Sequence, residues 1–407
     1  MSTTDVVHKW VEPRMLRWAR ARLHLEAADV VERVARLPGG AGSYRSVSAE
    51  ALAAWEEGRL QPTMADLETL ATTYDCPVGY FFLEQPPAES KALSFRGLDL
   101  SKPGQLGPET LVSIERFKFL AVWFGNVIND LGLDWPVMTG SANPNDPPGE
   151  VARRERARVG FSPAVRKDWV DANEAFSWWR RAIEGLGVFV FELKLDPNEV
   201  RGAALWAPGT PPCILVNRHD AESAAGRLFS LLHEYVHLTV TRPGCVCDLR
   251  GTGQEAEMET FANEAAAKML VQDEDFDAAL HESGLDLEAL RMGHHWSDAE
   301  IDRVRRPLRV SRDVLAIILE RRNLAPPGFY RHRRGHWDAR PRGNGWARHH
   351  PTRAERVLRE IGYSGSRVLS GERASSLSPL DVGDLLRVKV DHLDQVLAAL
   401  RDGGRQV

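Results

Sequence analysis

The chain has 407 residues, is 43% hydrophobic and carries a formal net charge of -5 at pH 7, so we expect two or three globular domains with sizeable cores. The mild charge specifies no partner, and 4 cysteines in so long a chain exclude a disulfide framework. No apolar run approaches the roughly 18 residues of a membrane span and the N-terminus does not read as a signal peptide, so we expect a cytoplasmic protein with no membrane partner.

Residues 1–85 are expected to form a small all-α domain. Apolar periodicity, punctuated by Gly58 and Pro62, predicts helices at 13–23, 26–37, 48–57 and 64–74. The run Leu-Ala-Ala-Trp-Glu-Glu-Gly-Arg-Leu-Gln-Pro-Thr at 52–63 resembles the end of an XRE-type helix-turn-helix. Residues 67–71 and 77–83 continue that resemblance, so the domain is predicted to be XRE-like.

The charges of this domain argue against tight DNA binding. The helix expected to read DNA carries Glu50, Glu56 and Glu57 and no Lys or Arg, although bases are usually read by Arg, Lys, Asn or Gln. Residues 1–85 hold 9 Lys and Arg against 12 Asp and Glu, and DNA affinity comes largely from neutralised phosphates. The loop at 38–46 also lengthens the usual path. Two interpretations of residues 1–85 therefore remain: a domain that binds DNA, and a packing module that has the fold without DNA affinity. DNA is a candidate partner under the first interpretation.

Residues 86–150 are predicted to contain a linker with Pro, Gly and Ser, followed by a connecting helix at 108–131. The next domain, 151–300, is expected to begin with helices near 150–159 and 170–186. Two short β-rich runs, at 187–191 and 213–216, are bounded by turn residues and are predicted to be strands.

Residues 233–237 read His-Glu-Tyr-Val-His within a run of helical periodicity that follows the second strand. Side chains four residues apart share one face of a helix, so His233 and His237 can bind one metal ion while Glu234 reaches a water on that ion. This is the arrangement of a zinc peptidase, in which the metal supplies Lewis acidity and the Glu takes a proton from the water.

The motif has two other interpretations. It can be a chance match, which is expected in roughly a few per cent of chains with this His content, or its two histidines can be hydrogen-bonded within a core. The flanking residues weaken both, because they predict a buried helix, and buried His is costly unless it is paired or metal-bound. These flanking residues are Leu228, Phe229, Leu231, Leu232, Val236 and Leu238.

A zinc site needs a third protein ligand, and the segment 254–270 can supply one from a following helix. Its apolar residues recur at helical spacing, and Glu255 and Glu259, four residues apart, can lie near the same face. The alternative is that all the acids of this segment are solvated surface. Cys245 and Cys247 can also bind a metal or sense redox state, but no second pair matches them, so a turn is preferred.

The region 301–407 is predicted to be helical and to include a basic stretch. Helices within 300–324 resemble a second helix-turn-helix-like pair, and 352–400 reads as a small helical unit. The stretch 303–359 holds 16 Arg and 4 acidic residues, a net of +12, with interleaved aromatic residues. Such a cluster can bind nucleic acid, but a solvated linker is slightly favoured because nothing in the pattern specifies a geometry.

With these residues placed, the chain resembles the ImmA/IrrE family of zinc metallopeptidases, most closely members with an N-terminal XRE-type domain. The resemblance runs from about residue 13 to residue 400 and is strongest over 153–270. It rests on Trp179-Arg180, Glu184, Gly-Val-Phe-Val-Phe at 187–191, Pro-Cys-Ile-Leu-Val-Asn at 212–217 and Phe-Ser-Leu-Leu-His-Glu at 229–234. One departure is Gln272, where many members have Pro, and it touches no ligand.

The resemblance implies both the third ligand and the fold. The family's ligand lies in a Glu-x-x-Ala/Cys-Asn motif, here Glu-Thr-Phe-Ala-Asn at 259–263, which selects Glu259 over Glu255 and Glu257. The implied fold is α+β: a mainly helical zincin-like metallopeptidase domain with a small sheet, preceded by an all-α helix-turn-helix domain and followed by helical units. The implied partner is a protein substrate of the repressor type.

We therefore predict a zinc-dependent endopeptidase with Zn2+ as its cofactor. His233, His237 and Glu259 are the expected metal ligands, and Glu234 is the expected catalytic general base on a zinc-bound water. Asn263 is expected either to orient a ligand or to pack as a helix amide. Tyr235 is a weak candidate for stabilising the oxyanion.

The rival hypothesis is a DNA-binding transcriptional regulator that uses the XRE-like domain and keeps the peptidase fold as a sensor. A third hypothesis is a combined regulator and protease that cleaves a co-encoded repressor or antitoxin.

Overall fold

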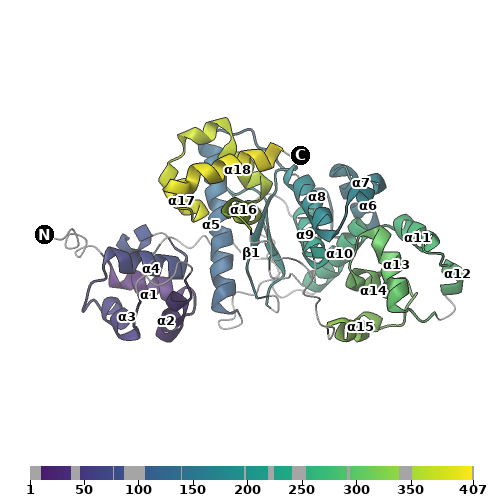
Figure 1. The fold of residues 1–407 in the computed structure, drawn as a ribbon, viewed down its shortest axis with the longest axis horizontal. Helices are drawn as coiled ribbons and strands as arrows, with labels where there is room; N and C mark the ends of the chain where they lie inside the picture. The colour runs from purple at the N-terminus through teal and green to yellow at the C-terminus, as the bar shows by residue number, and fades with distance from the viewer. Residues whose placement is uncertain are drawn as a thin grey trace.

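Over the residues that it describes, the structure, a computed structural model, is mostly helical with one three-stranded sheet, which confirms the expected α+β class. It describes residues 11–37, 46–76, 78–86, 106–138, 140–196, 199–218, 224–240, 254–290, 294–338 and 351–405. Figure 1 shows an N-terminal helical unit beside a larger body in which helices cover the sheet.

The N-terminal unit contains the helices that the sequence predicts for it. They are α1 (Pro13–Ala21), α2 (Ala27–Ala35), α3 (Ala49–Glu56) and α4 (Met64–Tyr74), followed by a 3-10 turn, η2 (Val78–Phe82). The Ser48 hydroxyl caps α3 by accepting a hydrogen bond from the Ala51 N–H at 3.1 Å, and Thr63 and Asp66 form a capping box on α4. The core of the unit includes Leu16, Val30, Leu52, Leu67 and Leu70.

The acidic residues of α3 do not all face solvent. Glu56 is buried and accepts two hydrogen bonds of 2.8 Å from the Arg20 guanidinium, whereas Glu50 and Glu57 are exposed. Glu56 therefore holds α1 against α3. The assignment of this unit as a helix-turn-helix stays a prediction.

The sheet has the strand order β1-β3-β2, with β1 (Phe189–Leu193), β2 (Gly202–Leu205) and β3 (Cys213–Asn217). β1 runs parallel to β3 and β2 runs antiparallel to it, so β2 forms one edge. The two predicted strands are confirmed with shifted ends. The sequence does not indicate β2, because Gly-Ala-Ala-Leu has none of the β-branched or aromatic residues that favour a strand.

Helices cover both faces of the sheet (Figure 1). One face packs with α5 (Pro108–Asp130), α16 (Arg353–Ser370) and α18 (Leu393–Arg405), and the other with α8 (Ala172–Glu184) and α9 (Ala224–Val240). Successive strand residues point to opposite faces, so Phe189 and Phe191 join the first cluster and Val190 joins the second. The result is a helix–sheet–helix sandwich with two apolar cores.

The first core joins segments that lie far apart in the sequence. α5 contributes Phe117 and Phe124, and α16 contributes Ile361 and Val368, to the same buried cluster as the sheet. The sequence suggested a connecting helix and a separate C-terminal unit for these segments. The domain boundaries at 150 and 300 stay a prediction, but chain on both sides of them completes one face of the sheet.

The second core extends away from the sheet through a series of helices. α10 packs against α9 and α6, and the core continues as far as Phe329. These elements are α6 (Pro148–Arg158), α7 (Pro163–Asp168), α10 (Gln254–Leu270), α11 (Asp273–Glu282), α12 (Leu287–Leu290), α13 (Asp298–Leu308), α14 (Arg312–Arg321) and α15 (Phe329–Asp338). α17 (Pro379–Leu386) belongs to the first core and precedes α18. Among the described residues no helix is both long and apolar enough to cross a membrane.

The basic stretch is folded and ion-paired over residues 303–338. Its arginines pair with acids at or beyond its N-terminal border: Arg305 and Arg312 with Asp302, Arg333 with Asp298, and Arg322 with Asp273 and Asp277. A solvated linker, the slightly favoured interpretation, is therefore wrong for this part. The charge counted along the sequence is partly neutralised by neighbours in space. Residues 339–350 lie outside the described residues.

Candidate metal centre

Helix α9 carries three of the predicted site residues and is held against the sheet by its apolar face. Leu231, Leu232, Tyr235 and Val236 are all fully buried. His237 is 3% exposed and Glu234 8% exposed, so the motif lies inside the molecule at the rim of the core. This agrees with the burial expected from the flanking residues.

Helix α10 brings the predicted third ligand to the same place. Its buried face is rich in alanine, with Ala262, Ala265 and Ala266 completely inaccessible, which lets α10 approach α9 closely. Glu259 points from this helix toward the two histidines, whereas Glu257 is exposed. The Glu255 side chain, together with Cys245 and Cys247, lies outside the described part of the chain.

The two imidazoles and the Glu259 carboxylate converge on one point. The Nε2 atoms of His233 and His237 lie 3.0 Å apart. His233 Nε2 is 3.2 Å from Oε2 of Glu259, and His237 Nε2 is 3.2 Å from Oε1. One ligand atom from each residue lies within 4.8 Å of the others, so this group could hold a metal ion.

The donor set fits a zinc-type ion. Two imidazole nitrogens and a carboxylate oxygen are ligands of catalytic zinc, and atoms this close together can all lie about 2 Å from a single ion. Three protein ligands leave a position for water or substrate. The Glu259 side chain is 40% exposed while the His237 side chain, taken alone, is 4% exposed, so the open side of the site lies toward the carboxylate.

The electrostatics of the site follow from these contacts. Hydrogen bonds with His233 and His237 hold the pKa of Glu259 well below its usual range, against the opposing effect of burial. Burial disfavours the charged form of His233, but Glu259 and the negative charge of Glu234 outweigh it, so the pKa of His233 is raised. The Asn263 side chain adds to this shift, which places it beside the imidazole. Its predicted role in orienting a ligand is not tested by this proximity.

Glu234 lies between α9 and the edge strand β2. A Cβ atom placed on Gly202 would be 3.0 Å from Cγ and 3.0 Å from Oε1 of Glu234. The carboxylate is close enough to His233 for its charge to raise the pKa of that imidazole. A carboxylate near a histidine pair is a group of the type that acts as a general base.

Tyr235 does not face the site, so its candidacy as an oxyanion partner is wrong. Its side chain is fully buried, and its hydroxyl donates a 2.6 Å hydrogen bond to Oε2 of Glu155 on α6. The Ser141 hydroxyl donates to the other oxygen of Glu155 at 2.5 Å. Sequence reasoning missed Glu155, because a single acid 80 residues before Tyr235 carries no signal of the contact.

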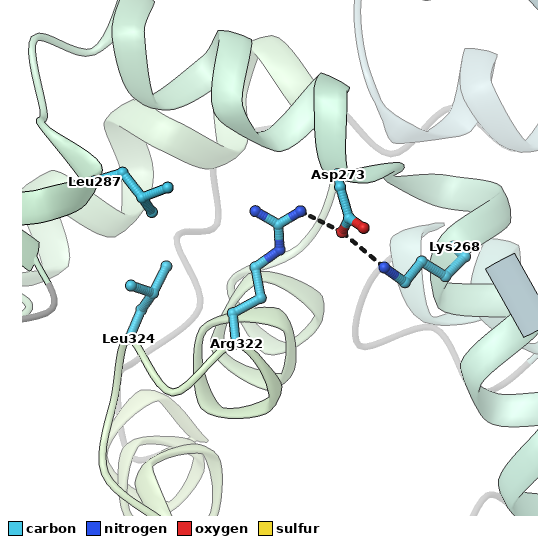
Figure 2. Close-up of a pocket in the computed structure, with 5 residues that line it drawn as sticks. All are labelled: Lys268, Asp273, Leu287, Arg322 and Leu324. Carbon is cyan, nitrogen blue, oxygen red and sulfur yellow. Dashed lines mark hydrogen bonds and ion pairs between the residues drawn. The ribbon is translucent and has the colours of Figure 1, made fainter.

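A separate pocket lies among α10, α11, α12 and α14 (Figure 2). It is lined by Leu287 and Leu324 on one side and by Lys268, Asp273 and Arg322 on the other. Lys268 Nζ lies 2.6 Å from Oδ1 of Asp273, which also pairs with Arg322. The cations of this pocket are thus already neutralised, and it contains none of the predicted site residues.

Comparison with protein-family models gives a match, which covers the region of this centre. Residues 183–320 match the peptidase M78 family model, described as the IrrE N-terminal-like domain. The match contains β1 to β3, α9 and α10, and therefore the whole candidate site. It supports a metallopeptidase-type function in general and a relationship to the ImmA/IrrE family. The comparisons with curated proteins and with solved structures gave no match.

Proposed function

We propose that the protein is a zinc-dependent endopeptidase whose centre is formed by His233, His237, Glu259 and Glu234. The observation that carries this proposal is the convergence of two imidazoles and one carboxylate from two helices, with a second carboxylate beside them. A bound zinc would supply Lewis acidity and lower the pKa of a water molecule to about 7.

The residues of the site have separate roles in metal binding and in proton transfer. His233 and His237 would hold the ion through Nε2, the atoms that lie closest to Glu259, and Glu259 would hold it through its carboxylate. Glu234 takes a proton from the attacking water and passes it to the departing amine nitrogen, so that the peptide yields one carboxylate and one amine. The apolar residues packed around α9 exclude bulk water from the inner side of the site.

The proposed substrate class rests on the resemblance of the sequence to the ImmA/IrrE family and not on the geometry. We propose a folded regulatory protein, of the repressor type, that presents a peptide segment to the site. The open side next to the half-exposed Glu259 is where such a segment would enter.

A trapping experiment tests the proposal. Full-length Glu234→Gln should retain zinc and capture the substrate without cleaving it, because the ligands are intact and the base is absent. The captured protein should then be cleaved by the wild type. Cleavage at an undiminished rate by Glu234→Gln would remove Glu234 from the mechanism.

The alternative is a DNA-binding regulator whose peptidase fold acts as a sensor. Its supporting observation is the order of four helices in the N-terminal unit, with a capped α3 and α4. The exposed carboxylates of Glu50 and Glu57 weigh against it, because they would repel DNA phosphates. Sequence-specific gel shifts by the full chain at physiological salt, lost on deletion of residues 1–85, would favour this alternative.

A further inference from the structure

The edge strand β2 meets the motif helix at a glycine. The cross-strand pairs Gly202–Val216 and Ala204–Ile214 alternate with Ala203–Leu215 and Leu205–Cys213. Ala204, Ile214 and Val216 belong to the core on the α9 side, whereas Ala203, Leu205, Leu215 and Cys213 belong to the core on the α5 side. Position 202 therefore faces α9, and any side chain there would point at that helix.

The atom that such a side chain would meet belongs to Glu234. A Cβ atom at position 202 would be 3.0 Å from both Cγ and Oε1 of Glu234 and 3.1 Å from the Leu215 carbonyl oxygen. Carbon atoms in ordinary contact lie about 3.5–4.0 Å apart, so even one methyl group is too close. Gly202 does not have a positive φ, so the backbone conformation does not require a glycine at this position.

We propose that Gly202 is a positioning residue for Glu234: the missing side chain leaves the space in which the Glu234 side chain lies. The inference deepens the proposed peptidase function and rests on it for its consequence in catalysis. Strand β2 forms one wall of this space, and α9 forms the other.

The geometry also says what a methyl group at position 202 would do. Of the two neighbours that it meets, the Leu215 carbonyl belongs to the sheet backbone, whereas the Glu234 carboxylate is the end of a flexible side chain. The side chain is therefore the part that moves. Relieving a contact of 3.0 Å requires a shift of a few tenths of an ångström, and catalytic rates are sensitive to the placement of the reacting groups.

A double-mutant cycle on the zinc-free full chain tests the contact without any substrate. Gly202→Ala should lower Tm by about 2 °C or more in the wild-type background. The decrease should be clearly smaller in a Glu234→Ala background, because that variant lacks the side-chain atoms that the new methyl group would meet. Gly149→Ala is the control: no atom lies within 4 Å of its Cβ position, so it should shift Tm equally in both backgrounds. An equal loss from Gly202→Ala in both backgrounds would assign the clash to Leu215 and overturn the proposal.

The same cycle covers the case in which Gly202→Ala alone does not fold. Recovery of folded protein by adding Glu234→Ala would support the contact, and failure of the double variant to fold would contradict it. Both outcomes are independent of zinc and of peptidase activity.

A second measurement, with acetohydroxamate as the probe on zinc-loaded protein, tests the consequence for the site. Gly202→Ala should keep the zinc content of the wild type but bind acetohydroxamate about tenfold more weakly, the equivalent of one charge-assisted hydrogen bond. Glu234→Gln should show a similar loss, and Gly149→Ala none. Wild-type affinity in Gly202→Ala alone would overturn the positioning role. Wild-type affinity in Glu234→Gln would instead contradict the proposed role of Glu234, while the Tm cycle still decides on Gly202.

Discussion

The hydroxyl of Tyr235, in the middle of the His-Glu-Tyr-Val-His motif, donates a 2.6 Å hydrogen bond to the completely buried carboxylate of Glu155. The bond joins α9 to α6 on the side of α9 that faces the core. The same carboxylate accepts from Ser141, and the neighbouring N–H groups of Ser141 and Ala142 donate to the Thr239 carbonyl near the end of α9. These contacts fix the orientation of α9 about its own axis. They thereby determine the direction in which the side chains of His233 and His237 point.

Tyr235→Phe should therefore destabilise the protein without removing its metal site. The substitution removes the 2.6 Å hydrogen bond to Oε2 of a buried carboxylate, and Arg158 Nη1 lies 3.6 Å from that oxygen, beyond hydrogen-bond distance, so we expect a cost of about 1–3 kcal/mol. Urea unfolding of the full chain would measure this loss. Because the phenol does not face the ligands, zinc content should equal that of the wild type, and a variant with normal stability and no zinc would contradict this account of α9.

Glu259→Gln should weaken zinc binding far more than Glu257→Gln. Both acids lie on α10, but only Glu259 points to the histidines, and Glu257 is exposed. Loss of a residue that merely orients a ligand typically lowers metal affinity about 10–100-fold, so loss of a ligand should exceed about 100-fold. Competition with a chromogenic chelator would give both affinities. Equal affinities in the two variants would exclude Glu259 as a ligand.

Glu184→Gln should change how stability depends on pH. Burial raises the pKa of Glu184 to about 7 from its usual 4.5, although Arg180 and the N–H groups of Ser364 and Tyr363 act in the opposite direction. The folded state then holds a proton more tightly than the unfolded state. The contribution of Glu184 to stability is fully present below pH 4.5 and is lost as the pH rises through about 7.

The measurement is the free energy of unfolding of wild type and Glu184→Gln between pH 4.5 and pH 8. The wild type should lose stability relative to the variant as the pH rises across this window, since glutamine does not titrate there. A difference that stays constant with pH would show that Glu184 titrates with an ordinary pKa.

Gly362→Ala should destabilise the sheet face covered by α16. Gly362 interrupts this helix with a φ of 72° and a ψ of -175°, and the break frees the N–H groups of Tyr363 and Ser364 to donate to Glu184 at 3.1 and 3.2 Å. A Cβ at this position would collide with Glu184 and lie 2.8 Å from the Val190 carbonyl oxygen. We expect a loss of more than about 1 kcal/mol in urea unfolding, whereas the control Gly149→Ala, which has open space around its Cβ position within α6, should cause no loss.

Several features of the fold could be predicted from the sequence because they depend on local patterns. The helical spacing of apolar residues indicated α9 and α10, and the four-residue spacing placed His233 and His237 on one face. The choice of Glu259 came from a family motif, and the structure places this residue at the histidines. The edge strand β2 could not be predicted, since three of its four residues are Gly or Ala and its pairing partner lies elsewhere in the chain.

The features that sequence reasoning missed all depend on contacts between distant segments. Glu155 meets Tyr235 across 80 residues, and the Tyr363 N–H meets Glu184 across 179. The basic stretch looked unbalanced because Asp298 and Asp302, which pair with its arginines, lie just before the counted residues. A charge count along the chain does not include neighbours in space, and no local propensity encodes these pairs.

Metal analysis of the purified full chain tests the central claim most directly. The account predicts about one zinc per chain in the wild type and in Glu234→Gln, and little or none in His237→Ala, because only the last variant lacks a ligand. A wild-type protein that holds no zinc and takes none up, or a His237→Ala protein that holds as much as the wild type, would contradict the account.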